Sequence, residues 1–161
     1  MRKVFRDDHE MFRDQARRFI DKEITPYLEQ WDKDGIVPRE IWRKAGQTGL
    51  LCSTVPEEYG GPGGDYGHSA VMIEELARVN ATAVGFTTHS EIVANYIVAY
   101  GTDEQKQRWL PGMVSGEIIG VLGLSEPSIG SDLRAMRTQF KRDGDAYRVS
   151  GQKTFITNGG N

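Results

Sequence analysis

The feature that most constrains this fold is a change in the spacing of apolar residues near Gly116. Before Gly116, apolar residues recur at steps of three and four, which places them along one side of a helix. The first such stretch contains Phe12, Ala16, Phe19, Ile20, Ile24, Tyr27, Leu28 and Trp31. After Gly116, residues 118–124 form a short apolar run with β-branched side chains, which is typical of a buried strand. The sequence therefore predicts helices followed by strands.

Prolines and glycines divide the helical part into segments. Pro26 is expected to split the first stretch into two helices, because proline suits a first helical turn and damages a helix interior. Pro38 opens a short helix that ends at Gly46 or Gly49. Residues 56–67 form a loop, since glycines and prolines are dense there.

Three further helices are expected after this loop. The first spans residues 66–79, and the second spans residues 82–100 and ends at Gly101. Thr102 is expected to cap the third helix, which ends near Gly116. The second helix is apolar on most sides, so we expect its neighbours to bury it.

The end of the sequence predicts a β-hairpin and one more strand. Residues 138–142 and 147–150 flank an Asp-Gly-Asp turn, and residues 152–157 continue as a strand. Strands without a covering layer leave open edges, which natural domains avoid. We therefore expect residues 1–117 to form a helical domain and residues 118–161 to be the first strands of an incomplete β-domain.

Charge and composition exclude several classes of protein. The chain has 20 basic and 23 acidic side chains and a formal net charge of -3, so no nucleic-acid partner is expected. With 38% hydrophobic residues, it is too apolar for a disordered chain. No apolar run approaches the roughly 20 residues that span a membrane. Residues 1–10 turn acidic too soon for a targeting peptide, which predicts a cytoplasmic location.

The stretch with the most chemical character is residues 123–135, whose sequence is GLSEPSIGSDLRA. The predicted strand leads here into a tight loop with hydroxyls at Ser125, Ser128 and Ser131. Gly130 lets the backbone approach a ligand closely, and exposed N–H groups with serine hydroxyls can bind a phosphate or the polar edge of a ring. Glycine- and serine-rich turns are common, so the residues alone favour an ordinary turn.

This stretch resembles the signature of the acyl-CoA dehydrogenase family, in which Leu-Ser/Thr-Glu-Pro leads to Gly-Ser-Asp. Ile129 departs from the pattern, because the family usually has a small residue there. Other family landmarks are similar to residues 56–61, 74–77, 101–106, 144–147 and 151–159, in family order and at family spacing. Among the family's branches, residues 89–93 and 95–97 and Phe155 look most like the long-chain acyl-CoA dehydrogenases.

The resemblance implies an α+β fold, with an amino-terminal all-α helical bundle followed by the truncated start of an antiparallel β-barrel-like middle domain. It also implies FAD, bound between the β-domain and the helices. The residues implied to bind FAD are Leu122, Leu124, Ser125, Gly130, Ser131, Phe155, Ile156 and Thr157. Ser131 is also implied to contact the acyl-CoA. Ser125 would stabilise negative charge at the pyrimidine edge of the reduced ring, and Phe155 stands where many family members have tryptophan.

The activity implied by the resemblance is α,β-dehydrogenation of a fatty acyl-CoA, of long chain, in fatty acid β-oxidation. Electrons would pass to an electron-transfer flavoprotein, and the complete protein would be a homo-oligomer, such as a homotetramer. The family's base is a carboxylate in a carboxy-terminal domain that no residue here matches, so we expect this chain alone to be inactive. Two alternatives stay open: an acyl-CoA oxidase or flavin monooxygenase of the same superfamily, and a non-catalytic helical interaction module.

Four other side chains invite chemical roles but favour structural ones. Glu126 and Asp132 resemble an acid–base pair, yet we expect Glu126 to brace the loop and Asp132 to cap a helical turn. His89 lies in an apolar helix without a second metal ligand nearby, which indicates a hydrogen-bonded helix histidine, and no metal site is expected. Cys52, the single cysteine, is expected to be a small buried residue.

Overall fold

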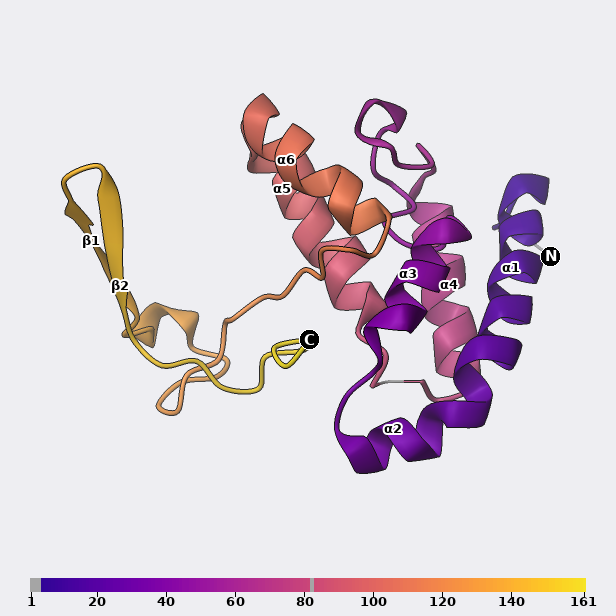
Figure 1. The fold of residues 1–161 in the computed structure, drawn as a ribbon, viewed down its shortest axis with the longest axis horizontal. Helices are drawn as coiled ribbons and strands as arrows, with labels where there is room; N and C mark the ends of the chain where they lie inside the picture. Colours follow the sequence, from indigo (N-terminus) through magenta and orange to yellow (C-terminus); the bar gives the residue numbers. More distant parts are fainter. Residues whose placement is uncertain (1–3, 82) are drawn as a thin grey trace.

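A computed structural model describes residues 4–81 and 83–161, and it has a helical body from which a β-hairpin projects (Figure 1). The helices are α1 (Asp7–Phe19), α2 (Leu28–Asp34), α3 (Arg39–Gln47), α4 (Tyr66–Arg78), α5 (Asn95–Tyr100) and α6 (Asp103–Val114). The strands are β1 (Gln139–Asp143) and β2 (Ala146–Ser150), which pair antiparallel. The predicted order of helices and then strands is confirmed.

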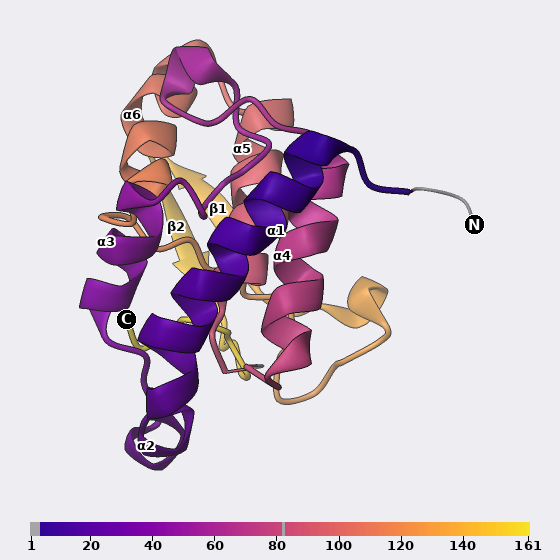
Figure 2. The ribbon, with the colours of Figure 1, turned by 90° about the vertical axis from the view of Figure 1, so that its right-hand side faces the viewer.

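The first helical stretch divides where Pro26 was expected to divide it. Between α1 and α2 the chain winds through a π-helical turn (Ile20–Ile24) and a 3-10 turn (Thr25–Tyr27). Proline supplies no N–H and crowds the preceding turn, so the regular hydrogen-bond pattern cannot continue through it. As a result α2 runs off at an angle from the end of α1 (Figure 2).

Most of the helical body is held by one apolar core between α1, α3, α4, α6 and the turns before α5. Its largest fully buried apolar side chains include Ile20, Ile24, Trp42, Leu50, Leu51, Phe86, Leu110 and Met113. Trp42 is central, because its ring meets Phe86 edge-on with 4.7 Å between the ring centroids. Truncating a buried aromatic side chain of this size to alanine lowers the free energy of unfolding by on the order of 3 kcal/mol or more.

A buried carboxylate joins α1 to α4, which lie side by side (Figure 2). Glu75 is 2% exposed and accepts hydrogen bonds from Arg17 (2.7 and 2.9 Å), Arg78 (2.9 Å) and Arg13 (3.2 Å). Hydrogen bonds from Arg17, then Arg78 and Arg13, lower the pKa of Glu75 to about 2. The carboxylate is thus charged and fully paired.

The helix predicted over residues 82–100 differs from the structure at its start. Thr82 lies outside the described residues, and helical hydrogen bonding begins only after Gly85. The chain then forms a π-helical turn (Thr88–Ala94) before α5. This wider turn carries His89, Ser90 and Ala94 into the core. Apolar periodicity does not distinguish π from α turns, which explains why the sequence predicted one plain α-helix.

The hairpin is confirmed, whereas the two other predicted strands are wrong. Gly144, with φ +63°, forms the turn of the hairpin. Residues 118–124 and 152–157 are extended or turned and belong to no sheet in the part of the chain that the structure describes. A strand needs a neighbouring strand for its N–H and C=O groups, and apolar pattern alone does not supply one. Phe155 also has φ +54°, which interrupts an extended backbone.

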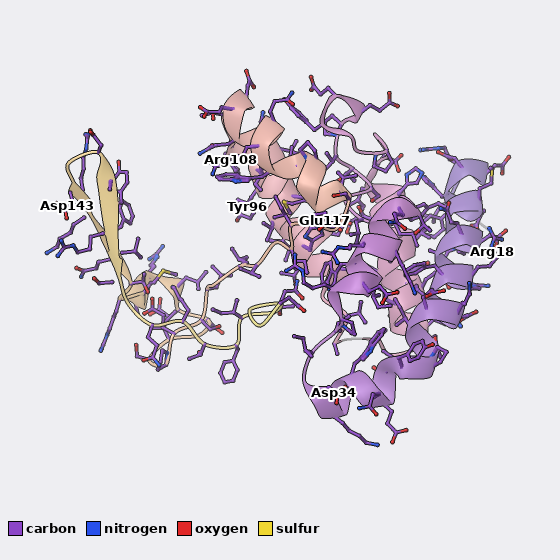
Figure 3. All side chains as sticks on the ribbon, viewed as in Figure 1. Arg18, Asp34, Tyr96, Arg108, Glu117 and Asp143 are labelled. Atoms are coloured by element: carbon purple, nitrogen blue, oxygen red, sulfur yellow. The ribbon has the colours of Figure 1, made fainter. Side chains whose placement is uncertain are left out.

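The hairpin and the helical body differ in how their side chains are placed (Figure 3). Every residue of β1 and β2 is exposed, and Asp143 marks the outer end of the hairpin in Figure 3. In the helical body, side chains from several helices meet in the shared core. The last residues of the chain return toward this body, where Asn158 contacts Gly85.

Candidate flavin site

Two segments that are far apart in the sequence lie side by side, and both were implied to bind the cofactor. The amide of Thr154 donates to the carbonyl of Ser125 at 3.0 Å. The Lys153 ammonium donates to the carbonyl of Leu124 at 3.2 Å. The structure thus brings Leu124 and Ser125 next to Lys153 and Thr154, which directly precede Phe155, Ile156 and Thr157 in the sequence.

Glu126 fixes the loop that follows Ser125. Its buried carboxylate accepts hydrogen bonds from the amides of Arg137 (2.7 Å) and Thr138 (2.9 Å) and from the Lys153 ammonium (2.9 Å). These hydrogen bonds, with those of Thr138 the largest, lower the pKa of Glu126 to about 2. Glu126 therefore connects three separate parts of residues 118–161, and its predicted bracing role is confirmed.

Asp132 also has its expected structural role. Its carboxylate accepts a hydrogen bond of 3.2 Å from the amide of Arg134, at the start of a 3-10 turn (Leu133–Ala135). A carboxylate in this position satisfies an N–H group that the short helix leaves unpaired. Both carboxylates are thus engaged in hydrogen bonds to the backbone of the loop.

The implied cofactor residues differ in exposure. Ser125 and Ile156 are half-buried, whereas Leu124 is 41% and Phe155 is 95% exposed. Thr157 lines a cavity of about 250 Å³ together with residues of α4 and the turn after it, among them Leu76, Val84 and Gly85. An aromatic ring as exposed as that of Phe155 presents a flat apolar surface to any ligand beside it.

Gly130 and Ser131 are not brought against the other implied residues. Both are exposed and follow a short backbone bridge between Glu126 and Ile129. A Cβ atom added to Gly130 would meet nothing within 4 Å, so the space beside this backbone is open. The loop can therefore accept a ligand without rearranging its own packing.

His89 is a hydrogen-bonded helix histidine, as predicted. It is fully buried, its Nε2 lies 3.1 Å from the carbonyl of Met113, and its Nδ1 lies 2.9 Å from the amide of Gly120. Burial lowers the pKa of His89 to about 4. Cys52 is buried next to it, as expected, and burial raises the pKa of its thiol to about 12. Both side chains are thus neutral at physiological pH.

Sequence reasoning missed Asn158. Its amide Nδ2 donates to the carbonyls of Gly85 (3.1 Å) and Gly120 (3.3 Å), which joins the end of the chain to the helical body. The only local signal is an asparagine in a left-handed conformation, φ +67°, within an Asn-Gly-Gly sequence. The partners are distant in sequence and could not be found from this signal.

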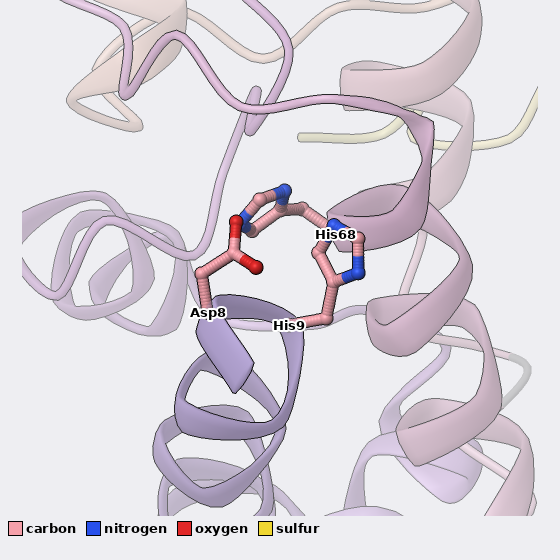
Figure 4. A group of neighbouring side chains, drawn as sticks. All are labelled: Asp8, His9 and His68. Atoms are coloured by element: carbon pink, nitrogen blue, oxygen red, sulfur yellow. The ribbon is translucent and has the colours of Figure 1, made fainter. Parts of the chain in front are cut away.

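A second polar cluster joins the beginnings of α1 and α4, where Asp8, His9 and His68 face one another (Figure 4). The Arg6 guanidinium forms ion pairs of 2.8 Å with both Asp8 and Asp65. Buried His9 accepts a hydrogen bond from the Arg6 amide at Nδ1, and its Nε2 lies 2.8 Å from Asp65. Arg6 and these hydrogen bonds already engage the Asp8 carboxylate and both ring nitrogens of His9, so the cluster serves as a structural ion network.

Comparison with known proteins gives one consistent result. Residues 6–117 match the family model described as acyl-CoA dehydrogenase, N-terminal domain. The rat long-chain specific acyl-CoA dehydrogenase is 46% identical over 99% of this chain and 37% of its own length. A crystal structure of an acyl-CoA dehydrogenase from Geobacillus kaustophilus superposes with a TM-score of 0.94 at 48% identity, over 99% of this chain and 42% of that one.

A glutaryl-CoA dehydrogenase from Mycobacterium smegmatis, solved in complex with FADH2, superposes with a TM-score of 0.86 at 30% identity. The match covers 98% of this chain and 41% of that one. The chain thus spans well under half the length of these relatives. In the described residues, no helix has the length and apolar character needed to cross a membrane.

One expectation is corrected by these relatives. The sequence predicted a cytoplasmic location, but the rat relative is named as a mitochondrial protein. Targeting segments are removed from many mature proteins, so the first residues of a folded chain are a poor guide to its compartment. The family itself is clear from the family model, the identity over the whole chain and the shared fold: this chain belongs to the acyl-CoA dehydrogenase family.

Proposed function

We propose that the complete protein is an FAD-dependent acyl-CoA dehydrogenase that removes two hydrogens from the α and β carbons of a long-chain fatty acyl-CoA in β-oxidation. The observation that carries this proposal is the pairing of residues 122–126 with residues 153–158 through the Thr154–Ser125 hydrogen bond. We further propose that residues 1–117 form the helical domain, and that residues 118–161 begin a β-barrel-like middle domain.

The chain's own residues suit FAD. The exposed Phe155 ring offers a flat apolar contact, and the half-buried Ser125 on the neighbouring segment offers a hydroxyl for a polar ring edge. The open backbone at Gly130 and the exposed Ser131 suit the negatively charged diphosphate. An apolar surface bordered by a few hydrogen-bonding groups is what a flavin ring requires.

Each of these residues has a proposed role. When bound, FAD would accept the hydride from the substrate's β carbon. One face of the cofactor site would be formed, and water excluded from it, by Leu122, Leu124, Phe155, Ile156 and Thr157. Ser125 would donate its hydroxyl hydrogen where negative charge gathers on reduction, and Ser131 would contact both the cofactor and the acyl-CoA. These are the residues that the family resemblance implied.

The base that removes the substrate's α proton is proposed to lie outside the described residues. Glu126 is 5% exposed and accepts hydrogen bonds from three donors, and Asp132 caps a helical turn. A base needs a lone pair that faces the substrate, and we propose that these two carboxylates serve the loop backbone instead. The 161-residue chain alone is therefore expected to show no turnover.

The chain length and partners extend the proposal. The 46% identity to the rat long-chain specific enzyme supports a long-chain substrate. We propose an electron-transfer flavoprotein as the acceptor and a homotetramer as the assembly. An oxidase or a flavin monooxygenase would share the same fold and cofactor residues but would pass electrons to oxygen.

The test uses the complete protein. Heat release and chromatography of the cofactor are expected to give FAD, and a long-chain acyl-CoA is expected to bleach its absorption without oxygen. Reoxidation in air is expected to be slow. Fast peroxide release would favour the oxidase instead, and a colourless protein that takes up no added FAD would favour a non-catalytic helical interaction module.

A pair of serine variants locates the proposed cofactor contact. Ser125→Ala is expected to lower the FAD affinity by about tenfold, the effect of losing one well-placed hydrogen bond. Ser128→Ala is the control, because Ser128 is exposed in the same loop and has no proposed contact. Equal FAD affinity in both variants would remove Ser125 from the site.

A further inference from the structure

The backbone of Gly120 is held by side chains at both its N–H and its C=O. His89 Nδ1 accepts the hydrogen bond from the Gly120 amide at 2.9 Å, in a buried position. Asn158 Nδ2 donates to the Gly120 carbonyl at 3.3 Å and to the Gly85 carbonyl at 3.1 Å. The backbone of one residue is thus connected to the π-helical turn through His89 and to residues 156–161 through Asn158.

This arrangement requires one tautomer of His89. Because Nδ1 accepts from an amide, Nδ1 carries no proton, and the ring proton lies on Nε2. Nε2 then donates to the Met113 carbonyl at 3.1 Å. Burial favours this neutral ring, and the neighbouring Cys52 thiol, 3.4 Å from Nε2, is neutral as well. His89 therefore serves as a fixed hydrogen-bond acceptor and not as a proton carrier.

Two glycines make these contacts possible. A Cβ atom on Gly120 would lie 2.8 Å from the Met113 methyl carbon and 2.9 Å from Val93 Cγ1. A Cβ atom on Gly85 would overlap the Asn158 amide group. At Gly120 and at Gly85 the backbone lies closer to neighbouring side chains than a larger residue would allow. The contacts of Gly120 and Asn158 therefore depend on glycine at both positions.

We call the contacts of His89 and Asn158 with Gly120 the clamp. The clamp lies at one end of the two paired segments. Gly120 precedes Leu122 by two residues, and Asn158 directly follows Thr157. At the other end, the Thr154 amide donates to the Ser125 carbonyl. The segments thus run antiparallel between two attachment points, 120 to 158 and 125 to 154. Six of the implied cofactor residues lie between these points or at their ends.

We propose that His89 and Asn158 are positioning residues that set the flavin-facing segments against each other through the backbone N–H and C=O of Gly120. The inference rests on the proposed function for its link to FAD. Neither residue is proposed to touch the reacting atoms. Their effect is to fix the spacing of Leu122–Ser125 and Phe155–Thr157 before the cofactor binds, which reduces the ordering cost of binding.

Two substitutions at His89 separate positioning from packing in the complete protein. His89→Asn places an amide oxygen near the position of Nδ1 and keeps an acceptor for the Gly120 amide. His89→Gln places its amide nitrogen near Nε2, keeps the donor to Met113 and loses the acceptor. Both remove the buried ring, so a purely structural role predicts similar losses of stability and similar FAD affinity.

Positioning predicts a difference between the two variants. His89→Gln is expected to weaken FAD binding by about tenfold relative to His89→Asn, and to shift the bound flavin's absorption spectrum. Asn158→Asp, which keeps the left-handed backbone but removes the donor to Gly120, is expected to resemble His89→Gln. Equal FAD affinity and equal spectra in all three variants would overturn the proposal.

Hydrogen exchange of the Gly120 amide tests the clamp without the cofactor. In cofactor-free protein, this amide is expected to exchange at least about tenfold faster in His89→Gln than in His89→Asn. If the wild-type protein fails to bind FAD while the two variants still differ in Gly120 exchange, the proposed function is contradicted and the clamp stands. Equal exchange rates would contradict the clamp, whatever the cofactor result.

Discussion

The helical body and residues 118–161 are held in place by different interactions. The helical body encloses an apolar core, with Trp42 fully buried at its centre. In residues 118–161 the buried residues are Gly120 and Glu126, and order comes from hydrogen bonds. An apolar pattern produces a core only where neighbouring elements can bury it, whereas a buried carboxylate can organise a loop alone.

The largest expected effect is in the helical core. Trp42→Ala should lower the free energy of unfolding by about 3–5 kcal/mol, because it removes a fully buried indole and leaves a cavity against Phe86. Urea unfolding followed by circular dichroism measures this. Tyr100→Ala is the matched control, since Tyr100 is 81% exposed. A loss at Trp42 no larger than at Tyr100 would show that this core does not hold the body together.

Glu75 tests the charged contact between α1 and α4. Glu75→Gln should lower the free energy of unfolding by about 2 kcal/mol, because three arginines lose a buried charged acceptor while remaining partly solvated. Glu74→Gln is the control on the same helix, where the carboxylate is 54% exposed. Equal unfolding midpoints for the two variants would contradict a stabilising role for the Glu75 contacts.

The same carboxylate gives the helical body a pH dependence. The folded-state pKa of Glu75 is lowered to about 2 from its ordinary 4.5, so the stabilisation is complete above pH 4.5. It is lost as the pH falls from 4.5 toward 2, because the unfolded chain takes up a proton in this range while the folded carboxylate stays charged. The free energy of unfolding, measured with urea at a series of pH values across this range, should fall less steeply in Glu75→Gln than in the wild type. Parallel curves would rule out Glu75 as a main source of acid sensitivity.

Glu126 should affect residues 118–161 and leave the helical body nearly unchanged. In Glu126→Gln, one acceptor oxygen becomes an NH2 group, so the side chain loses its contact either with Arg137 or with both Thr138 and Lys153. The backbone amide that loses its acceptor, that of Arg137 or of Thr138, should exchange hydrogen about tenfold faster, while the free energy of unfolding of the helical body changes by less than about 0.5 kcal/mol. A large loss in helical stability would show that the two regions fold as one unit.

The smallest expected effect is in the hairpin. Phe140 is 73% exposed, so Phe140→Ala should change the free energy of unfolding of this chain by less than about 0.5 kcal/mol, despite a volume change like that in a core aromatic. The edge-on contact with Tyr147 is the main interaction lost. A loss above about 2 kcal/mol in urea unfolding would indicate that the hairpin face is buried in solution.

The sequence predicted those features that depend on local spacing. Pro26, Pro38 and the Asp-Gly-Asp turn mark real boundaries, because proline and glycine restrict or permit backbone angles wherever they occur. The strand predicted over residues 118–124 is absent from the structure, since its apolar residues indicate burial but not the partner that a strand needs. The π-helical turns share the apolar spacing of α-helix and were missed for that reason.

The site shows the same division between local and distant information. The roles of Glu126 and Asp132 were predicted because each bonds to backbone groups within a short stretch of chain, which a loop sequence can indicate. The contacts of Asn158 with Gly85 and Gly120 join positions far apart in the sequence, as does the contact of His9 with Asp65. Such pairs become visible only when the fold places them together.

The most direct test of the central claim is hydrogen exchange of the complete protein with and without FAD. The expected result is slower exchange on FAD binding at residues 122–125 and 154–157 together, with little change at the hairpin turn around Gly144. Slower exchange in one segment alone, or in neither, would contradict a shared flavin-binding surface made by these two parts of the chain.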